Sequence, residues 1–271
     1  MINKDFSVKN VLVVGGTSGI NRGVAEKFGE AGAKVAVASR LQSKVDDTVN
    51  TLKQHTDAMG FICDVRNYEE VEAGINQVAE AWGSIDVLVS GAAGNFPAMA
   101  NKMSANAFRS VVEIDLLGTY HVMRAAYPHL TKPGASVINI SAPQAELAMV
   151  AQSHVCAAKA GVDMVTRTLA LEWGPEGIRI NSVIPGPISG TEGMKRLAPT
   201  AELQEACMKT VPLRRMGNTD DIAHACMMLS TPFASFITGA VLPVEGFWAL
   251  GGRSAVGSAM EDFIPSLLPL G

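Results

Sequence analysis

A glycine-rich run near the start of the chain has the residue types that can hold a phosphate group. The run is "VLVVGGTSGINRG", residues 11–23, in which Gly15 and Gly19 separate an apolar stretch from an amphipathic one. Glycine lets a chain turn tightly and approach a pyrophosphate closely, beside the free N–H groups that begin a helix. The apolar run before the glycines and the helical pattern after them make this more than an isolated turn. We therefore predict that a dinucleotide cofactor binds here.

The end of the second apolar run indicates which dinucleotide is preferred. The run reads "VAVASR" and ends in Ser39 and Arg40, where an acidic residue would favour the free ribose hydroxyls of NAD. A guanidinium can instead hold a 2′-phosphate through paired, charge-assisted hydrogen bonds. The alternative is that Arg40 is an ordinary solvated side chain. The sequence favours NADPH.

Short apolar runs alternate with helical patterns along most of the chain. One helical pattern places Ile20, Val24 and Phe28 on a single face and stops at Gly32. Unbroken apolar runs suit strands that are buried on both faces of a parallel sheet. The alternation predicts an α/β fold, a single doubly wound parallel sheet of the Rossmann type. The seven expected strands begin at Val11, Val35, Phe61, Val87, Ser136, Arg179 and Ala240.

The pattern continues without a linker, so we expect one domain over residues 1–271. Two segments differ from it. Residues from about 187 to 216 follow the sixth strand and are long for a connection, which predicts a lid over a substrate. The tail from about 249 to 271 is rich in Gly, Ser and Pro, and we expect it to be ordered only against a neighbouring subunit.

Composition narrows the kinds of partner. The chain is 48% hydrophobic and 18% charged, as in globular proteins, and its net charge of −4 gives no reason to expect nucleic acid. No run resembles a signal peptide or a membrane span, which predicts a cytoplasmic protein that does not bind membranes. Four scattered cysteines show no metal-ligand spacing, so we expect neither a metal site nor a disulfide framework.

Several runs together resemble one family. They are "GGTSG" at Gly15, "CDV" at Cys63, "GAAGN" at Gly91, "AAKAG" at Ala157 and "PGPISGTEG" at Pro185. Over nearly the whole chain the sequence is similar to the short-chain dehydrogenase/reductase family. One departure is Asn21, where the family usually has a third glycine. Because Asn tolerates unusual backbone angles, we expect the turn to adjust there and binding to persist.

This resemblance extends the predicted cofactor site. Asp64 matches the position that contacts the adenine ring, although a carboxylate there can instead cap the following helix. Residues from Pro185 onward match the segment that closes over the nicotinamide and the phosphates. The implied cofactor-binding residues are Gly15, Thr17, Ser18, Gly19, Ile20, Ser39, Arg40, Asp64, Val65, Ala92, Lys159, Pro185, Gly186, Ile188 and Thr191.

The catalytic positions of the family are altered in this chain. The resemblance implies a Ser, a Tyr, a Lys and an Asn, and at the matching positions stand Ala142, Val155, Lys159 and Asp115. Neither Val nor Ala can donate a proton, so ordinary ketone reduction loses its general acid. Asp115, if it lies near Lys159, can form an ion pair that binds and polarises a water molecule.

This set of changes resembles the NADPH-dependent 2,4-dienoyl-CoA reductases, most closely the peroxisomal type. The resemblance implies that hydride adds to the far end of a conjugated diene and that a proton enters next to the thioester, giving a 3-enoyl-CoA. Lys159 would hold the nicotinamide ribose and, with Asp115, order the water that supplies the proton. It also implies an acyl-CoA substrate and a homotetramer.

Other residues are weaker candidates for the substrate site. Asn95 and Phe96 follow the fourth strand and can contact the acyl thioester, or simply pack the loop. His154 can carry a proton or be structural. Four basic residues in the lid segment are candidates to bind the phosphates of CoA, although such side chains are often only solvated. They are Lys195, Arg196, Arg214 and Arg215.

Two other functions fit the same residues. The first is a different acyl-thioester or carbonyl reductase, in which groups of the substrate replace the missing acid. The second is a pseudoenzyme that binds NADPH without turning it over. Lys159 and Asp115 favour an enzyme, whereas Val155 and Ala142 favour the pseudoenzyme.

Overall fold

The computed structural model describes residues 6–249, apart from the side chains of residues 196 and 197. Within that range the chain forms one parallel sheet of seven strands in the order β3-β2-β1-β4-β5-β6-β7. Each of the seven apolar runs is a strand, so the predicted doubly wound α/β fold is confirmed. The strands are β1 (Asn10–Val14), β2 (Lys34–Ser39), β3 (Ala58–Ile62), β4 (Val87–Ser90), β5 (Ser136–Ile140), β6 (Arg179–Pro185) and β7 (Val241–Val244).

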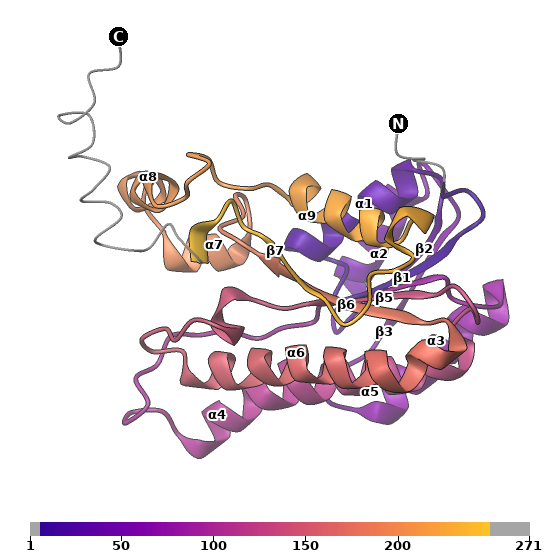
Figure 1. The fold of residues 1–271 in the computed structure, drawn as a ribbon, viewed down its shortest axis with the longest axis horizontal. Coiled ribbons are helices and arrows are strands. Elements are labelled where there is room, and N and C mark those ends of the chain that lie inside the picture. The colour runs from indigo at the N-terminus through magenta and orange to yellow at the C-terminus, as the bar shows by residue number, and fades with distance from the viewer. Residues whose placement is uncertain (1–5, 250–271) are drawn as a thin grey trace, which may run out of the picture.

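Helices cover both faces of this sheet, as Figure 1 shows. On one face lie α1 (Gly19–Glu30), α2 (Gln42–Leu52) and α9 (Thr219–Leu229). On the other lie α3 (Tyr68–Trp82), α4 (Ala105–Val111), the π-helical turn η1 (Val112–Leu117), α5 (Gly118–Ala126) and α6 (Ser153–Trp173). Short 3-10 turns are η2 (Tyr127–His129), η3 (Pro143–Ala145), η4 (Gly174–Glu176) and η5 (Pro232–Ala234).

Two apolar cores separate the sheet from its helices. Val24 and Phe28 of α1 are fully buried in one of them, as their spacing predicts, and Gly32 follows the helix with a φ of +90°. Val71 and Ile75 of α3 are buried in the other core. The strands alternate their side chains between the two cores, which is why nearly every strand residue is apolar.

The order of the strands determines at which edge of the sheet a ligand can bind. The chain enters the sheet at β1, runs outward to β3, then crosses back to β4 beside β1. Loops on the two sides of this crossover leave in opposite directions at the carboxyl ends of the strands, and the resulting crevice is where doubly wound sheets bind ligands. Residues predicted to bind the cofactor follow β1, β2, β3 and β4.

The expected lid lies beyond β6. It contains two helices, α7 (Glu192–Leu197) and α8 (Ala201–Lys209), and a parallel bridge from Ile188 to Gly217 closes its base. In Figure 1 these helices lie at one end of the sheet, away from the layers of α1 and α6. The predicted tail lies outside the described residues beyond Ala249.

Two further observations concern the cysteines and the possibility of a membrane-spanning helix. All four cysteines are free, and Cys63 and Cys226 are buried in the core. Among residues 6–249 no helix has both the length and the apolar content that crossing a bilayer requires.

Candidate active site

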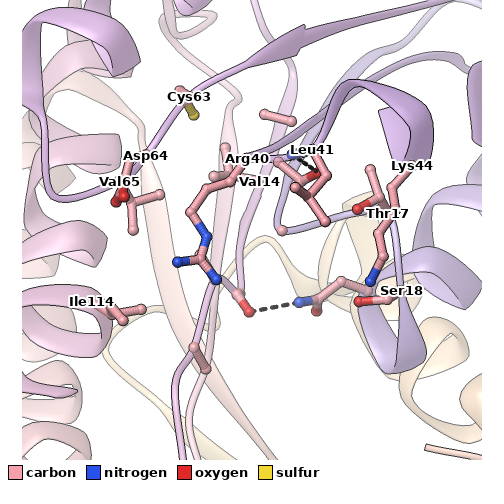
Figure 2. A pocket seen from close by; sticks show the side chains of 17 residues that line it. Val14, Thr17, Ser18, Arg40, Leu41, Lys44, Cys63, Asp64, Val65 and Ile114 are labelled. Atoms are coloured by element: carbon pink, nitrogen blue, oxygen red, sulfur yellow. Dashed lines mark hydrogen bonds between the residues drawn. The ribbon is translucent and has the colours of Figure 1, made fainter. Parts of the chain in front are cut away.

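A first cavity, of about 230 Å³, opens at the carboxyl ends of β1, β2 and β3 (Figure 2). It collects most of the side chains predicted to hold the adenosine and phosphate end of a cofactor. The glycine-rich turn forms one wall, and the ends of β2 and β3 form the others. Its lining includes the predicted residues Gly15, Thr17, Ser18, Ser39, Arg40, Asp64, Val65 and Ala92.

Close packing explains why glycine begins this turn. Gly15 has a φ of +79°, and a Cβ there would lie 2.8 Å from the backbone nitrogen of Ala92. Any larger residue would therefore push the loop after β4 away from the loop after β1. The cradle stays narrow enough for backbone N–H groups to face a bound pyrophosphate.

The expectation that the turn adjusts its backbone at Asn21 is wrong. Asn21 lies inside α1 and is not among the described residues with positive φ, so the turn does not adjust there. Instead its Nδ2 donates a 2.7 Å hydrogen bond to the carbonyl of Gly91. A Cβ at Gly91 would collide with the Asn21 amide. The side chain that replaces the family's glycine thus ties the first turn of α1 to the residue that follows β4.

Two cations point into the first cavity, and sequence reasoning identified only one of them. Arg40 follows β2, and Lys44 lies in the first turn of α2 (Figure 2). Its position in the sequence could have identified Lys44, because it lies one helical turn after Leu41, the residue that follows Arg40. Two positive charges at the end of β2 fit a 2′-phosphate better than two free hydroxyls.

Asp64 does not cap the helix that follows it. The cap of α3 is Asn67, whose side chain accepts from the backbone N–H groups of Glu69 and Glu70. Asp64 instead pairs with the Arg66 guanidinium, which donates to both of its carboxylate oxygens, and these hydrogen bonds hold the pKa of Asp64 below its usual value. The capping alternative is therefore excluded, and Asp64 stays at the wall of the cavity.

A second, larger cavity of about 540 Å³ adjoins the first and shares Ser18, Asn21, Gly91 and Ala93 with it. It extends from the carboxyl ends of β4 and β5 to the lid, and α7 and α8 form its outer wall. The predicted residues in its lining are Gly19, Ile20, Asn95, Asp115, Lys159, Pro185, Gly186, Ile188 and Thr191. The two cavities together make one continuous cleft for a cofactor and a substrate.

Asp115 and Lys159 meet at the wall of the second cavity. Lys159 Nζ lies 3.6 Å from Asp115 Oδ2 and donates a 2.9 Å hydrogen bond to the Ile140 carbonyl. The backbone N–H of Gly94 donates to Asp115 Oδ1 at 2.7 Å. Asp115 is 1% exposed and Lys159 5%. Burial raises the pKa of Asp115, and the charge of Lys159 and the Gly94 N–H oppose that shift.

A π-helical turn positions Asp115. The turn η1 separates α4 from α5, and the buried Thr119 hydroxyl donates a 2.7 Å hydrogen bond to the Asp115 carbonyl. An extra residue in a helical turn shifts the faces of the segments on either side, and such turns are frequent at functional sites. Nothing in the residue types around Asp115 distinguishes a π-helical turn from an α-helical one, so the sequence does not predict this turn.

The two positions that lack a hydroxyl lie at the same cavity. Val155 and Ala142 both line it, and Val155 also packs against Val111 and Ala158. This wall therefore offers an apolar surface where the family has the hydroxyl groups of a Tyr and a Ser. The proton-exchanging groups at this end of the cleft are Asp115 and Lys159.

Of the three weaker candidates for the substrate site, one lines the second cavity and two do not. Asn95 lines the second cavity. Phe96 does not. Its ring packs against the ring of His154 at a tilt of 55°, with centroids 4.6 Å apart, and His154 is fully buried and does not line the cavity. Phe96 thus packs the loop after β4 onto α6, which is the structural alternative for both residues.

The basic residues of the lid do not converge. Lys195 pairs with Glu192, and Arg215 makes two hydrogen bonds to Asp221. Arg214 donates to the Lys209 carbonyl. The side chain of Arg196 lies outside the described residues.

Comparison with known proteins decides the family. The family described as "Enoyl-(Acyl carrier protein) reductase" matches residues 14–246, which is most of the chain. The chain belongs to the short-chain dehydrogenase/reductase family. Among solved structures, a short chain dehydrogenase from Bacillus anthracis is 32% identical with a TM-score of 0.82, covering 90% of this chain and 98% of that one. A dehydrogenase/reductase from Sinorhizobium meliloti is 28% identical with a TM-score of 0.85, covering 93% and 98%.

Three curated relatives within this family are named as 2,4-dienoyl-CoA reductases, and their names print two different products. The peroxisomal (3E)-enoyl-CoA-producing 2,4-dienoyl-CoA reductase of Saccharomyces cerevisiae is 40% identical, covering 91% of this chain and 86% of the relative. That of Danio rerio is 38% identical, covering 87% and 79%. A probable (2E)-enoyl-CoA-producing 2,4-dienoyl-CoA reductase of Bacillus subtilis is 35% identical, covering 88% and 95%. This short-chain reductase is therefore an oxidoreductase similar to dienoyl-CoA reductases, with an NAD(P) cofactor.

Proposed function

We propose that this short-chain reductase uses NADPH to reduce 2,4-dienoyl-CoA thioesters to 3-enoyl-CoA thioesters in the degradation of unsaturated fatty acids. The observation that carries the proposal is the buried Asp115–Lys159 pair at a cavity wall where Val155 and Ala142 replace both hydroxyls. A ketone reductase needs a proton donor at the carbonyl oxygen. A conjugated thioester does not, because its oxygen only collects charge that is later discharged by a proton on carbon.

The choice of NADPH rests on the first cavity. Gly15 leaves the close approach that a pyrophosphate needs, and Arg40 and Lys44 supply two positive charges after β2. Guanidinium and ammonium groups both bind phosphate, the first through paired hydrogen bonds and the second as a point charge. A third nearby charge, that of Asp64, is already paired with Arg66, which reduces its repulsion of a phosphate.

The residues of the second cavity divide the work. When bound, the cofactor supplies the hydride. Lys159 holds the nicotinamide ribose, and Asp115 and Lys159 together orient a water molecule that protonates the carbon next to the thioester. Val155 and Ala142 keep that side of the cavity apolar, which favours a hydrocarbon chain over a hydroxylated one. Asn95 contacts the acyl thioester through its amide.

The acyl chain extends beneath the lid. There the cavity is lined by apolar side chains, and these exclude water from the reacting carbons. They are Met149, Met194, Ala198, Leu203 and Trp248. The remaining expectations, a homotetramer in the cytoplasm, stay predictions; the curated relatives named above from yeast and zebrafish are peroxisomal proteins.

The test is NADPH oxidation with three thioesters: a 2,4-dienoyl-CoA, a 2-enoyl-CoA and a 3-oxoacyl-CoA. We expect the dienoyl substrate to turn over fastest. Asp115→Ala and Lys159→Ala should lower its kcat by ~10²–10⁴-fold, the contribution typical of general acid catalysis. Val155→Ala, at the same wall, is the matched control and should change kcat little. Turnover of the oxoacyl substrate alone would rule out the proposal, as would tight NADPH binding without turnover of any substrate.

The position of the remaining double bond is a separate outcome of the same assay. The relatives at 38–40% identity are named for a (3E) product and the Bacillus relative for a (2E) product. Placing the proton next to the thioester, as the Asp115–Lys159 water would, leaves the double bond at carbon 3. Separation of the two enoyl-CoA isomers by chromatography checks this, and a (2E) product would contradict the proposed proton route.

A further inference from the structure

A second buried carboxylate lies behind the Asp115–Lys159 pair. Asp163 is on α6, one helical turn after Lys159, and is 2% exposed. Neither of its carboxylate oxygens has a hydrogen-bond partner among the described residues. An ionised carboxylate in such a place is costly, because burial removes its hydration and no donor replaces the lost water.

Two serine hydroxyls lie near Asp163, and one of them, that of Ser141, has an oxygen free to accept a hydrogen bond. Ser141 follows β5, and its buried Oγ also has no partner among the described residues. Ser182 of β6 is engaged with the Thr166 hydroxyl at 2.9 Å, and Thr166 accepts from Asn139 at 2.8 Å. Both serines lie close enough to favour the ionised form of Asp163, but neither makes a well-formed hydrogen bond with it.

A proton on Asp163 would give both the carboxyl group and the Ser141 hydroxyl a hydrogen-bond partner. A carboxylic acid at Asp163 can donate its O–H to the Ser141 oxygen, so that the carboxyl and the hydroxyl become partners. A carboxylate cannot do this, and the Ser141 hydroxyl would then have to rotate toward it as donor. Asp163 is 2% exposed and no donor among the described residues replaces its lost hydration, and this points to a protonated Asp163.

The charges around Asp163 favour the same state. Its own helix contributes Lys159 and Arg167, the strands β5 and β6 turn Ser141 and Ser182 toward it, and Asp115 of η1 pairs with Lys159. Two ionised carboxylates would share one buried ammonium and leave a net negative charge without water. Burial accordingly raises the pKa of both Asp115 and Asp163.

We propose that Asp163 is a neutral carboxylic acid in the working enzyme and acts as a positioning residue for Lys159, by leaving Asp115 as the only anionic partner of its ammonium. This rests on the function proposed above for Asp115 and Lys159. With Asp163 neutral, Lys159 stays on the Ile140 carbonyl at the cavity wall. An ionised Asp163 draws the ammonium one turn along α6, away from the cavity.

Infrared difference spectra across a pH titration test the protonation without any turnover. Wild type should lose one carboxylic-acid C=O band as pH rises, and Asp163→Asn should lack that band. Asp57→Asn, at an exposed aspartate, is the matched control and should keep it. If Asp163→Asn keeps every carboxylic-acid band of wild type, the inference is overturned and the proposed function is left untouched. Should Asp163→Asn not fold, Ser141→Ala replaces it: loss of the acceptor should shift the band, and an unshifted band overturns the inference.

Thermal unfolding supplies a second readout. Because the folded-state pKa of Asp163 is raised, the native chain binds more protons than the unfolded chain between the two pKa values. Stability therefore falls as pH rises through that interval. Asp115 adds a similar slope in both proteins, so the difference between wild type and Asp163→Asn isolates Asp163. We expect a flatter decline of Tm with pH in the variant, and identical slopes overturn the inference.

The pH dependence of kcat separates positioning from a merely structural role. At low pH, wild type and Asp163→Asn should have the same kcat within about two-fold. As pH rises, wild type should lose roughly ten-fold in kcat while the variant holds its rate, a smaller effect than the ~10²–10⁴-fold of losing a general acid. The inference fails if the variant is slow at every pH or follows the wild-type profile.

Discussion

Two cationic side chains, Arg40 and Lys44, line the cavity at the end of β2. Hydrogen bonds to charged groups are worth about 1.5–3 kcal/mol each, so Arg40→Ala and Lys44→Ala should each raise the Kd of NADPH by roughly ten-fold or more. The Kd of NADH should change little, because it has no 2′-phosphate. Fluorescence titration with both cofactors measures this.

Lys53→Ala, at the exposed far end of α2, provides the control for Arg40 and Lys44. It removes one positive charge at the other end of α2, outside the cavity, and both Kd values should stay at the wild-type level. An equal loss of NADH and NADPH affinity in Arg40→Ala would mean that this guanidinium holds the shape of the cavity and does not select the cofactor.

The sequence can place a single residue in the fold where a strand end fixes its position. Arg40 and Asp64 stand directly after apolar runs, and the carboxyl ends of parallel strands meet at one edge, so the sequence alone puts them at the site. Phe96 and His154 were harder, because whether a loop ring faces the ligand or packs on a helix depends on contacts between distant segments. Nothing in the sequence singles out Asp163, because the absence of a hydrogen-bond partner for its carboxylate is visible only in the three-dimensional structure.

Among the elements, the π-helical turn η1 holds the least predictable geometry and carries Asp115. Thr119→Val removes the buried hydroxyl that donates to the Asp115 carbonyl and keeps the shape of the side chain. We expect the free energy of unfolding to fall by about 0.5–1.5 kcal/mol, the usual net contribution of one intramolecular hydrogen bond. Urea denaturation measures the loss, and a fall in kcat with unchanged NADPH affinity would locate its effect at Asp115.

Ser110→Ala is the control for that turn. Ser110 also donates a hydroxyl hydrogen bond to a backbone carbonyl, that of Ala107, but it lies on α4 before the π-helical turn. Its loss should cost stability without lowering kcat. Equal kcat losses in both variants would show that the helix as a whole, and not the turn, positions Asp115.

The lid helices form an element whose contribution is apolar. Leu203 of α8 lines the second cavity although it is half exposed. Leu203→Ala removes buried hydrocarbon worth about 0.8 kcal/mol per CH₂, so kcat/KM should fall several-fold for a long-chain dienoyl-CoA and little for a short-chain one. Glu202→Ala, on the same helix but outside the cavity, should change neither. A loss that is equal for both chain lengths would place the acyl chain elsewhere.

At the scale of the whole molecule, the sheet was predictable because its strands are unbroken apolar runs. The prediction rests on burial: a strand covered by helices on both faces has no polar face, so β1, β2, β4 and β5 stand out in the sequence. The lid was visible only as an interruption of that pattern. Its two helices bury few side chains in the core, and their placement depends on the cavity they cover.

Assembly belongs to the same scale. α6 is the longest helix, and its outer face exposes Leu171 at 81% and Met164 at 59%, while Leu117 and Tyr120 are half exposed on the neighbouring η1 and α5. Apolar side chains exposed on neighbouring helices are typical of a surface that contacts another protein. If the chain is a homotetramer built on α5 and α6, each copy buries Leu171, and burial of a leucine is worth about 1.5–3 kcal/mol.

Leu171→Glu should therefore break the tetramer, because the loss of buried apolar area is joined by the cost of an unpaired carboxylate, repeated in every copy by symmetry. Light scattering coupled to size-exclusion chromatography should give the mass of four chains for wild type and a smaller mass for the variant. Lys53→Glu changes charge on the opposite layer and should leave the mass at four chains. A wild-type mass of one chain contradicts the expectation directly, and an unchanged mass in Leu171→Glu would move the contact away from α6.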